Sequence, residues 1–267
     1  MTLLRVSQQQ LNLLSTCPRK FQHTYLEQLT APVSPEEEVR SDWGSQFHLL
    51  MQQREMGLPI DILLETDPEL KQCLHEFLQA APELFPADKS SDFSFRDPEH
   101  QRTFKFENCL LTVVYDLLIA QENLARILDW KTYPRPKNRH YLAQNWQTRL
   151  YLYSLVETSD YAPEQVSMTY WFVRPNSGEP PASITFHYSH QSHQKNREDL
   201  AELLQQLEGY LENYAQGQAL PQISVTQGLC QSCQFSWRCQ RTDQPKDSPA
   251  IVLNSLPDLD RIKEVSI

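Results

Sequence analysis

The chain has 267 residues, of which 40% are hydrophobic and 22% charged, an ordinary mix for a globular protein with a substantial core. Its net charge of −10 has the wrong sign for a protein that coats nucleic acid by charge alone. The sequence has no apolar run near membrane-spanning length and no signal-peptide core at its N-terminus. We therefore expect a cytoplasmic protein with no membrane partner.

The N-terminal third is predicted to be helical. Ser7 followed by Gln10 is a capping box that opens a first helix, and the Cys17-Pro18 pair breaks it and starts a second one that ends near residue 29. A cap and proline at 34–35 start a long helix that runs to about residue 56, with Gly44 and His48 on one face. A further helix is expected at 67–80.

Strands follow, and helices then alternate with them. The apolar and β-branched runs predict strands at 93–96, 103–106, 110–119, 125–131, 166–173 and 183–188. Helices are predicted at 141–157 and 198–216. This order indicates a mixed α/β chain with a single domain over residues 1–240, followed by a C-terminal tail over 241–267.

Two aspartates are expected to face each other in this sheet. A tight two-residue turn at 122–123 would pair Gln121 with Leu124, and counting outward then places Asp116 opposite Asp129. A register slip of one residue would turn Asp116 away. Like charges that face each other across a strand pair are destabilising, so we expect a positive group between them.

A lysine lies beside the second aspartate. Asp129 and Lys131 are two residues apart, so both side chains leave the same face of the strand. Two carboxylates and an amine on one face suit a divalent cation with a water molecule beside it. The alternative is that Asp129 and Lys131 form a solvated strand end.

Basic residues follow this strand directly. Arg135, Lys137 and Arg139 lie close after Lys131 with no acidic residue among them. Such a stretch could contact a phosphate chain locally even though the whole protein is acidic. The alternative is a solvated loop.

Four of the six cysteines form a second pattern. Cys73 and Cys109 fall in predicted elements and are expected to be small buried residues. A cytosolic chain is unlikely to keep the others as disulfides, which favours metal binding. Three cysteines close together in the sequence and a fourth far away suit a Cys₄ iron–sulfur cluster. Zinc is the alternative, and four unrelated free thiols are the weakest of the three interpretations. The four cysteines are Cys17, Cys230, Cys233 and Cys239.

Taken in order, these motifs resemble the PD-(D/E)xK nuclease superfamily, in its RecB-like branch with an iron–sulfur cluster. That branch includes the AddB helicase–nuclease subunit and the CRISPR adaptation nucleases. The matching segments are Ser7, Leu11 and Cys17 to Phe21; Gly44 to His48; Asp116; Asp129 to Thr132; Gln147 to Tyr151; and Cys230, Cys233 and Cys239. One departure is the stretch Val113-Val114-Tyr115, where the family commonly has a glycine.

The resemblance implies a restriction-endonuclease-like core, in which a central mixed sheet is flanked by helices and a Cys₄ [4Fe–4S] staple joins the chain ends. It implies a metal-dependent DNA nuclease, an exonuclease acting on DNA ends or single strands in repair, recombination or defence, with a helicase or repair partner. His48, Asp116, Asp129 and the Trp130 carbonyl would bind Mg²⁺ or Mn²⁺. Lys131 would orient the attacking water or help to deprotonate it. Gln147 and Tyr151 would position the DNA backbone or support Lys131.

Two other functions are compatible with the same residues. One is a nuclease-like DNA-binding subunit that has lost catalysis, against which the intact acids and lysine argue. The other is a scaffold protein stapled by zinc. The colour of the purified protein separates the cluster from zinc, and a digestion assay separates an enzyme from a binder.

Overall fold

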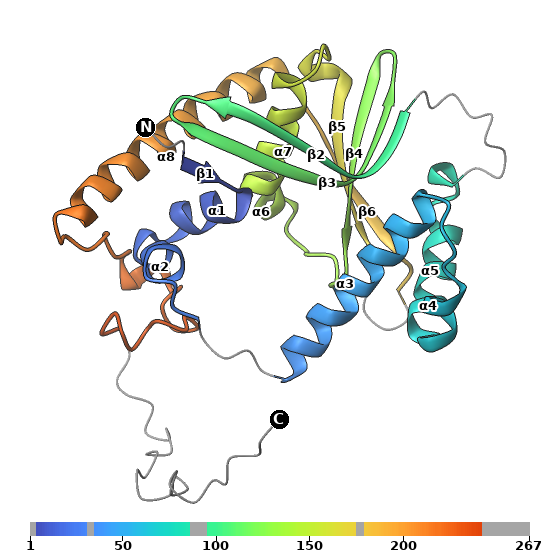
Figure 1. Cartoon of the computed structure of the whole chain (residues 1–267), viewed down its shortest axis with the longest axis horizontal. Coiled ribbons are helices and arrows are strands. Elements are labelled where there is room, and N and C mark those ends of the chain that lie inside the picture. Colours follow the sequence, from blue (N-terminus) through green and yellow to red (C-terminus); the bar gives the residue numbers. More distant parts are fainter. Residues whose placement is uncertain (1–3, 31–34, 86–94, 175–178, 242–267) are drawn as a thin grey trace, which may run out of the picture. The chain divides into compact units, whose positions relative to one another are not determined.

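The computed structural model describes residues 4–30, 35–85, 95–174 and 179–241 (Figure 1). The chain divides into two compact units, Met1–Leu220 and Pro221–Ile267. The first unit contains every strand in the described part of the chain. The predicted tail from residue 242 onward, and the first two residues of the strand predicted at 93–96, lie outside the described residues.

The first unit is built on a six-stranded mixed sheet. As expected from the sequence, a mixed central sheet is flanked by helices. Its long third strand pairs along one edge with β2 (antiparallel) and along the other with both β1 (parallel) and β4 (antiparallel). The fifth strand continues the sheet parallel to β4, and the sixth is antiparallel to the fifth. The strands are β1 Leu4–Val6, β2 Phe95–Phe106, β3 Cys109–Gln121, β4 Leu124–Lys131, β5 Val166–Phe172 and β6 Ala182–His187.

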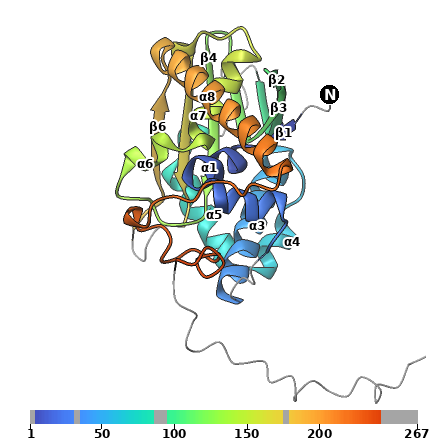
Figure 2. The same cartoon turned by 90° about the vertical axis from the view of Figure 1, so that its left-hand side faces the viewer.

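Helices cover both faces of this sheet (Figures 1 and 2). One apolar core lies between the sheet and α1, α7 and α8, and a second lies between the sheet and α3 and α5. The helices are α1 Gln8–Thr16, α2 Pro18–Phe21, α3 Pro35–Glu55, α4 Asp61–Thr66, α5 Pro68–Ala80, α6 Arg139–Gln144, α7 Trp146–Glu157 and α8 His190–Ala215. Short turns of 3-10 helix lie at Pro82–Leu84, Pro163–Gln165 and Val225–Gln227, and Gln22–Leu26 is a π-helix.

Three of the predicted helices differ from those in the structure. The helix predicted at 141–157 is two helices, α6 and α7, because Asn145 is extended and its side chain accepts a hydrogen bond from the Gln147 amide to cap α7. The helix predicted at 198–216 begins earlier, at His190, because Ser189 caps it. The helix predicted after Pro18 ends its regular turns at Phe21 and continues as the π-helix.

The strands predicted at 93–96 and 103–106 belong to one strand, β2. Pro98 lies in the middle of β2 and is tolerated there, because β2 pairs with β3 alone in the described sheet and the missing amide hydrogen of Pro98 leaves no second partner unsatisfied. The predicted turn after Gln121 is correct, because Gln121 pairs with Leu124 and the register continues to Leu117 opposite Leu128.

At Asp116, the side chains of β3 switch the face of the sheet to which they point. Tyr115 packs into the core under α7, whereas Leu117 packs into the core under α3, although regular alternation would put residues two apart on one face. The partner strand bends at the same level, because Glu99 has a left-handed backbone with φ of +50°. The sheet is therefore locally twisted where Glu99 and Asp116 lie opposite each other.

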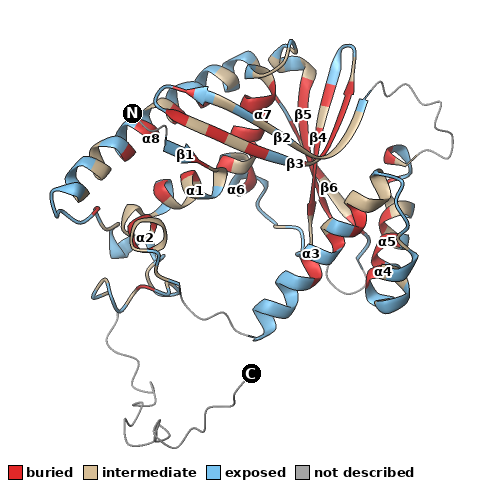
Figure 3. Ribbon diagram, viewed as in Figure 1, coloured by how far each residue is buried: buried red, intermediate tan, exposed pale blue. Residues whose placement is uncertain are grey.

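The second core fixes the side of the sheet that carries α3. Phe77 of α5 is fully buried and meets the rings of Trp130 and Trp171 edge-on, with centroids 5.4 Å and 5.3 Å away. Burial of one such side chain stabilises the fold by about 1.5–3 kcal/mol. The first eight residues of α3 are exposed, and its buried positions begin at Trp43, so only the later turns of α3 are anchored to the sheet (Figure 3).

In the second unit, backbone hydrogen bonds between residues three or four apart shape the cysteine segment. The Cys233 amide donates to the Cys230 carbonyl, and the Cys239 amide donates to the carbonyl of the buried Phe235. Within the described parts of the chain, no helix is both long enough and apolar enough to cross a membrane.

Candidate functional site

Strands β3 and β4 separate at Asp116, and the opening between Asp116 of β3 and residues 129–131 of β4 is called the fork. The Leu117–Leu128 pair is the last one between β3 and β4, and beyond it β4 continues beside β5 as far as Lys131. At the fork the Asp116 side chain replaces a backbone acceptor, because its Oδ2 accepts a hydrogen bond of 2.6 Å from the Trp130 amide. Helices from both faces of the sheet can reach side chains at this opening.

On the β4 side, Asp129 and Lys131 form a buried ion pair. Lys131 Nζ lies 2.5 Å from Asp129 Oδ1, and only 3% of the Asp129 side chain is exposed. The Asp129 contact is an ion pair rather than a well-directed hydrogen bond, since Oδ1 has no hydrogen-bond partner of good geometry. The alternative of a solvated strand end does not fit this burial.

One α7 side chain ties the two groups together. Gln147 Nε2 donates to Asp129 Oδ2 at 2.7 Å, and Gln147 Oε1 accepts from Lys131 Nζ at 2.9 Å. The side-chain amide of Gln147 thus offers its N–H donor to the carboxylate and its oxygen acceptor to the ammonium. This network fixes the direction of Nζ, which also lies 5.1 Å from the centre of the Tyr170 ring.

Tyr151 lies one helical turn after Gln147, and its role is mainly in packing. Its ring meets that of Tyr115 edge-on at 5.2 Å, and its backbone carbonyl accepts a hydrogen bond from the Tyr115 hydroxyl. Its own hydroxyl accepts a long contact of 3.4 Å from Gln8 Nε2 of α1. The predicted motif residue therefore connects α7 to β3 and α1.

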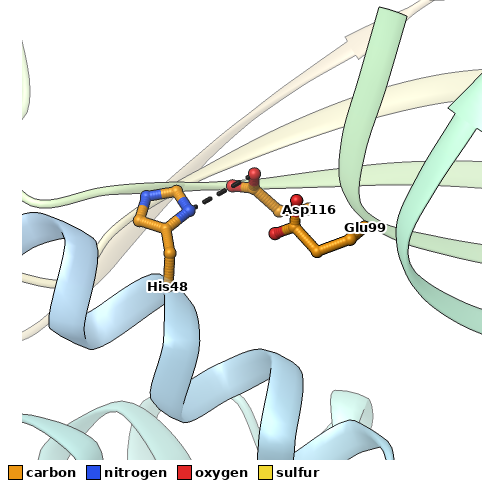
Figure 4. A group of neighbouring side chains, drawn as sticks. All are labelled: His48, Glu99 and Asp116. Atoms are coloured by element: carbon orange, nitrogen blue, oxygen red, sulfur yellow. Dashed lines mark ion pairs between the residues drawn. The ribbon is translucent and has the colours of Figure 1, made fainter.

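On the β3 side, a histidine and two acids come together. His48 of α3 places Nδ1 3.3 Å from Asp116 Oδ1, and Glu99 of β2 lies beside them (Figure 4). One ligand atom from each of the three lies within 4.8 Å of the others. This is the kind of group that can hold a divalent cation, and in the described residues no other set of histidine, cysteine or acidic side chains meets that spacing.

The charges of the site shift its protonation equilibria. Burial, and then the charge of Asp116, raise the pKa of Asp129 to about 7. Burial alone would lower the pKa of Lys131, but the Asp129 carboxylate outweighs it and the pKa rises above its ordinary value. Likewise, Asp116 outweighs the effect of burial and raises the pKa of His48. Lys131 is therefore a charged ammonium at neutral pH.

A glycine lets α3 approach the end of β4. A Cβ added at Gly44 would lie 2.9 Å from Thr132 Oγ1, closer than such contacts normally occur. Gly44 lies one turn before His48 on the same helix. The absence of a side chain at Gly44 therefore allows the helix to bring His48 to the fork.

The basic residues after β4 have different surroundings. Arg135 and Lys137 are exposed. Arg139, at the start of α6, donates to the Thr185 carbonyl at 2.6 Å, and its guanidinium lies 4.8 Å from the centre of the Phe186 ring. Arg139 thus anchors α6 to β6, while the other two extend into solvent.

The predicted cysteine cluster is not supported by the structure. The four cysteines of the predicted cluster are partly exposed: Cys17, Cys230, Cys233 and Cys239. Within the second unit, the described cysteines Cys230, Cys233 and Cys239 do not form a group of three potential ligands within 4.8 Å of one another. Cys73 and Cys109 are buried, as predicted, and the Cys73 thiol donates to the Val173 carbonyl.

Glu99 is the member of the site that sequence reasoning missed. Glu99 lies between the strands predicted at 93–96 and 103–106 and was therefore assigned to neither. The signal was nevertheless present in the sequence, because the Phe106–Cys109 pair closes a two-residue turn. Counting outward from that pair puts Glu99 opposite Asp116, the same procedure that puts Asp116 opposite Asp129.

The fold and these residues agree with a family of known enzymes. The sequence model of the PD-(D/E)XK nuclease superfamily matches residues 5–240. The chain therefore belongs to the PD-(D/E)XK nuclease superfamily.

Individual proteins resemble the chain more distantly, and no curated protein matches it. A solved structure of a candidate exonuclease from Eubacterium rectale has 11% identity and a TM-score of 0.48, and the match covers 90% of this chain and 89% of that one. The structure of the protein SSO0001 has 14% identity and a TM-score of 0.39, over 91% of this chain and 89% of that one. Likenesses at this level do not define an activity.

Proposed function

We propose that the protein is a metal-dependent deoxyribonuclease that hydrolyses phosphodiester bonds. The observation that supports this most directly is the fork at Asp116, where a partly exposed acid and histidine lie near a buried Asp129–Lys131 pair. The superfamily of the chain is one of nucleases. Geometry and family therefore point to the same chemistry.

His48, Asp116, Asp129 and the backbone carbonyl of Trp130 would hold Mg²⁺ or Mn²⁺. The donor set fits a hard cation, since it consists of carboxylate and carbonyl oxygens with one imidazole nitrogen. A divalent cation bound there would stabilise the negative charge that develops on the phosphate oxygens during hydrolysis.

Lys131 would orient the attacking water. Its ammonium is charged at neutral pH and held in place by Asp129 and Gln147, so it can donate a hydrogen bond to the water oxygen and offset charge on the phosphate. Gln147 acts as a positioning residue that sets the direction of Lys131 Nζ. Tyr151 would support α7 against β3.

We propose single strands and DNA ends as substrates, with Arg135 and Lys137 contacting phosphates. Both side chains are exposed on the segment that directly follows β4. Contacts to phosphate release counterions, so each one steepens the fall of affinity with salt. The Arg135→Ala/Lys137→Ala variant should bind short single strands with a shallower salt slope than the wild type. An unchanged slope would remove this segment from the substrate path.

A digestion assay tests the activity and the preference for ends. Metal-free protein would be given Mg²⁺ or Mn²⁺ with linear single strands, linear duplexes and covalently closed circles. The proposal expects metal-dependent loss of the linear substrates, fastest for single strands, while the circles persist. No digestion with either metal would refute the proposed activity, and cleaved circles would replace the exonuclease with an endonuclease.

We further propose a [4Fe–4S] cluster held by Cys17, Cys230, Cys233 and Cys239, with Zn²⁺ as the alternative. The proposal is supported by the spacing of the four cysteines in the sequence and by their chemistry, because cysteine sulfur is the donor that either group requires. Anaerobically purified protein should be brown and contain iron and acid-labile sulfide, and Cys17→Ala should lose both as fully as Cys233→Ala. A colourless protein with one bound zinc would favour zinc.

The proposed setting is the processing of DNA ends in repair, recombination or defence, with a helicase as partner. Cleavage that accelerates when a helicase supplies single strands from a duplex would support this setting. Equal rates with and without unwinding would speak against it.

A further inference from the structure

Glu99 lies across the β2–β3 pair from Asp116, and any part it has in metal binding rests on the proposed metal-dependent function. The register runs from Phe106 opposite Cys109 to Pro98 opposite Leu117 without an inserted residue, which puts Glu99 and Asp116 at the same level. Two carboxylates facing each other in this way repel and destabilise the strand pair. Such a pair suits a site in which a cation lies between the two.

The local backbone directs Glu99 toward the fork. Pro98 lies opposite Leu117, on the α3 side of the sheet, whereas His100 stacks on Tyr115, on the α7 side. Glu99 is the residue at which β2 changes faces, and its φ is +50°. In Figure 4 its carboxylate points to the same place as the Asp116 carboxylate and the His48 ring.

Asp129, the third acid of the site, already has partners within the protein. Asp129 is engaged by Lys131 at 2.5 Å and by Gln147 at 2.7 Å, and it does not belong to the group within 4.8 Å. Glu99, by contrast, has its carboxylate among the atoms that could surround a cation. The three carboxylates exceed the single ammonium of Lys131, so the site without a metal has an excess of negative charge.

We propose that Glu99 is a side-chain ligand of the catalytic cation, which it holds together with His48 and Asp116 on the β3 side of the fork. Glu99 adds a second full negative charge to the ligands on that side. The number of charged oxygen ligands tunes cation affinity over several orders of magnitude. Glu99 therefore strengthens the binding of Mg²⁺ or Mn²⁺, and the bound cation relieves the repulsion between Glu99 and Asp116.

The test compares two glutamates of the same strand pair. Glu99→Gln removes the charge and keeps the shape of the side chain. Glu107→Gln is the matched control, because Glu107 also has a left-handed backbone, with φ of +49°, but is exposed at the turn that joins β2 to β3. Both substitutions carry the same backbone cost, so a difference between them reports on the site.

The readout is Mn²⁺ binding to metal-free protein, followed by electron paramagnetic resonance, together with thermal melting with and without Mn²⁺. We expect Glu99→Gln to weaken Mn²⁺ binding on the order of tenfold or more, and Glu107→Gln to leave it unchanged. Without metal, Glu99→Gln should melt at or above the wild-type temperature, because the repulsion with Asp116 is gone. Added Mn²⁺ should then raise its melting temperature less than that of the wild type.

Asp116→Asn separates a failure of this inference from a failure of the proposed function. If Asp116→Asn abolishes Mn²⁺ binding while Glu99→Gln binds like the wild type, Glu99 is not a ligand and the metal site still stands. If neither substitution changes Mn²⁺ binding, both the ligand role of Glu99 and the proposed metal site are wrong. A Glu99→Gln protein that melts lower without metal would assign Glu99 a structural role and overturn the inference.

Discussion

The two sides of the fork differ in their charge balance. On the β4 side, Asp129 and Lys131 neutralise each other and Gln147 completes their hydrogen bonds, so the arrangement is stable without any ligand. On the β3 side, Glu99 and Asp116 face each other near His48. The Asp129–Lys131 side therefore needs no cation to balance its charges, whereas the Glu99–Asp116 side does.

The largest contrast is expected for Asp116→Asn. The asparagine oxygen can still accept the hydrogen bond from the Trp130 amide, so the fold should survive. Cleavage should fall by about a thousandfold or more, since the charge stabilisation supplied by a bound cation is worth several kcal/mol. Steady-state cleavage and thermal melting of the metal-free protein check the two halves of this prediction. Wild-type cleavage would contradict the division of roles.

On the β4 side, Lys131→Ala should cost both activity and stability. It leaves the buried Asp129 carboxylate without its partner, which destabilises a fold by about 3–5 kcal/mol when the remaining group is charged. The loss should shrink as the pH falls toward 7, because the ammonium lowers the pKa of Asp129 to about 7 and the variant without it takes up the proton at higher pH. Urea denaturation at pH 8 and pH 6 measures this, with the exposed Lys137→Ala as the control. Equal losses for the two lysines would contradict the account.

Cation binding should strengthen as the pH rises. Asp129, with a pKa of about 7 in the metal-free protein, must lose its proton to bind a cation, and His48, whose pKa is also raised, must be neutral. Both effects have the same sign, so Mn²⁺ affinity should increase by about tenfold or more from pH 6 to pH 8. Anaerobic binding isotherms across this range provide the measurement. An affinity independent of pH would show that neither group binds the metal.

A moderate effect is expected where α3 meets the end of β4. Gly44→Ala would place a methyl group 2.9 Å from Thr132 Oγ1 and push the helix that carries His48 away from the fork. Overpacking of this kind costs about 1–3 kcal/mol, and we expect cleavage to fall about tenfold. The double variant Gly44→Ala/Thr132→Ala should recover both. A Gly44→Ala protein with normal cleavage would show that the spacing of α3 does not matter.

The smallest effect should come from Tyr151→Phe. The hydroxyl receives a long 3.4 Å contact from Gln8 and also interacts with the Gln147 side chain, and the ring contact with Tyr115 remains after the substitution. A neutral hydrogen bond contributes about 1 kcal/mol, which limits the loss of cleavage to about fivefold. Gln147→Ala, which removes hydrogen bonds to both Asp129 and Lys131, should lose more. The reverse order would assign Tyr151 a direct part in the reaction.

Turn geometry and residue spacing predicted the β3–β4 part of the site better than the β2 part. The turn after Gln121 follows from backbone geometry, and the observed register agrees with the prediction as far as the Leu117–Leu128 pair, where pairing ends one residue before Asp116 and Asp129. Glu99 was hidden because Pro98 is usually a strand breaker and because the faces of β2 and β3 exchange at this level, which no periodicity reveals. The predicted cysteine cluster depends on two segments far apart in the chain, and spacing rules carry no information on such a distance.

The central claim is that the fork at Asp116 is a metal-dependent nuclease centre. Its most direct test is the digestion of linear single-stranded DNA by metal-free wild type and Asp116→Asn, purified identically, before and after Mn²⁺ is added. We expect no digestion without metal, digestion by the wild type once Mn²⁺ is present, reversal by a chelator, and digestion by Asp116→Asn that is slower by about a thousandfold or more. Equal Mn²⁺-dependent digestion by both proteins would contradict it.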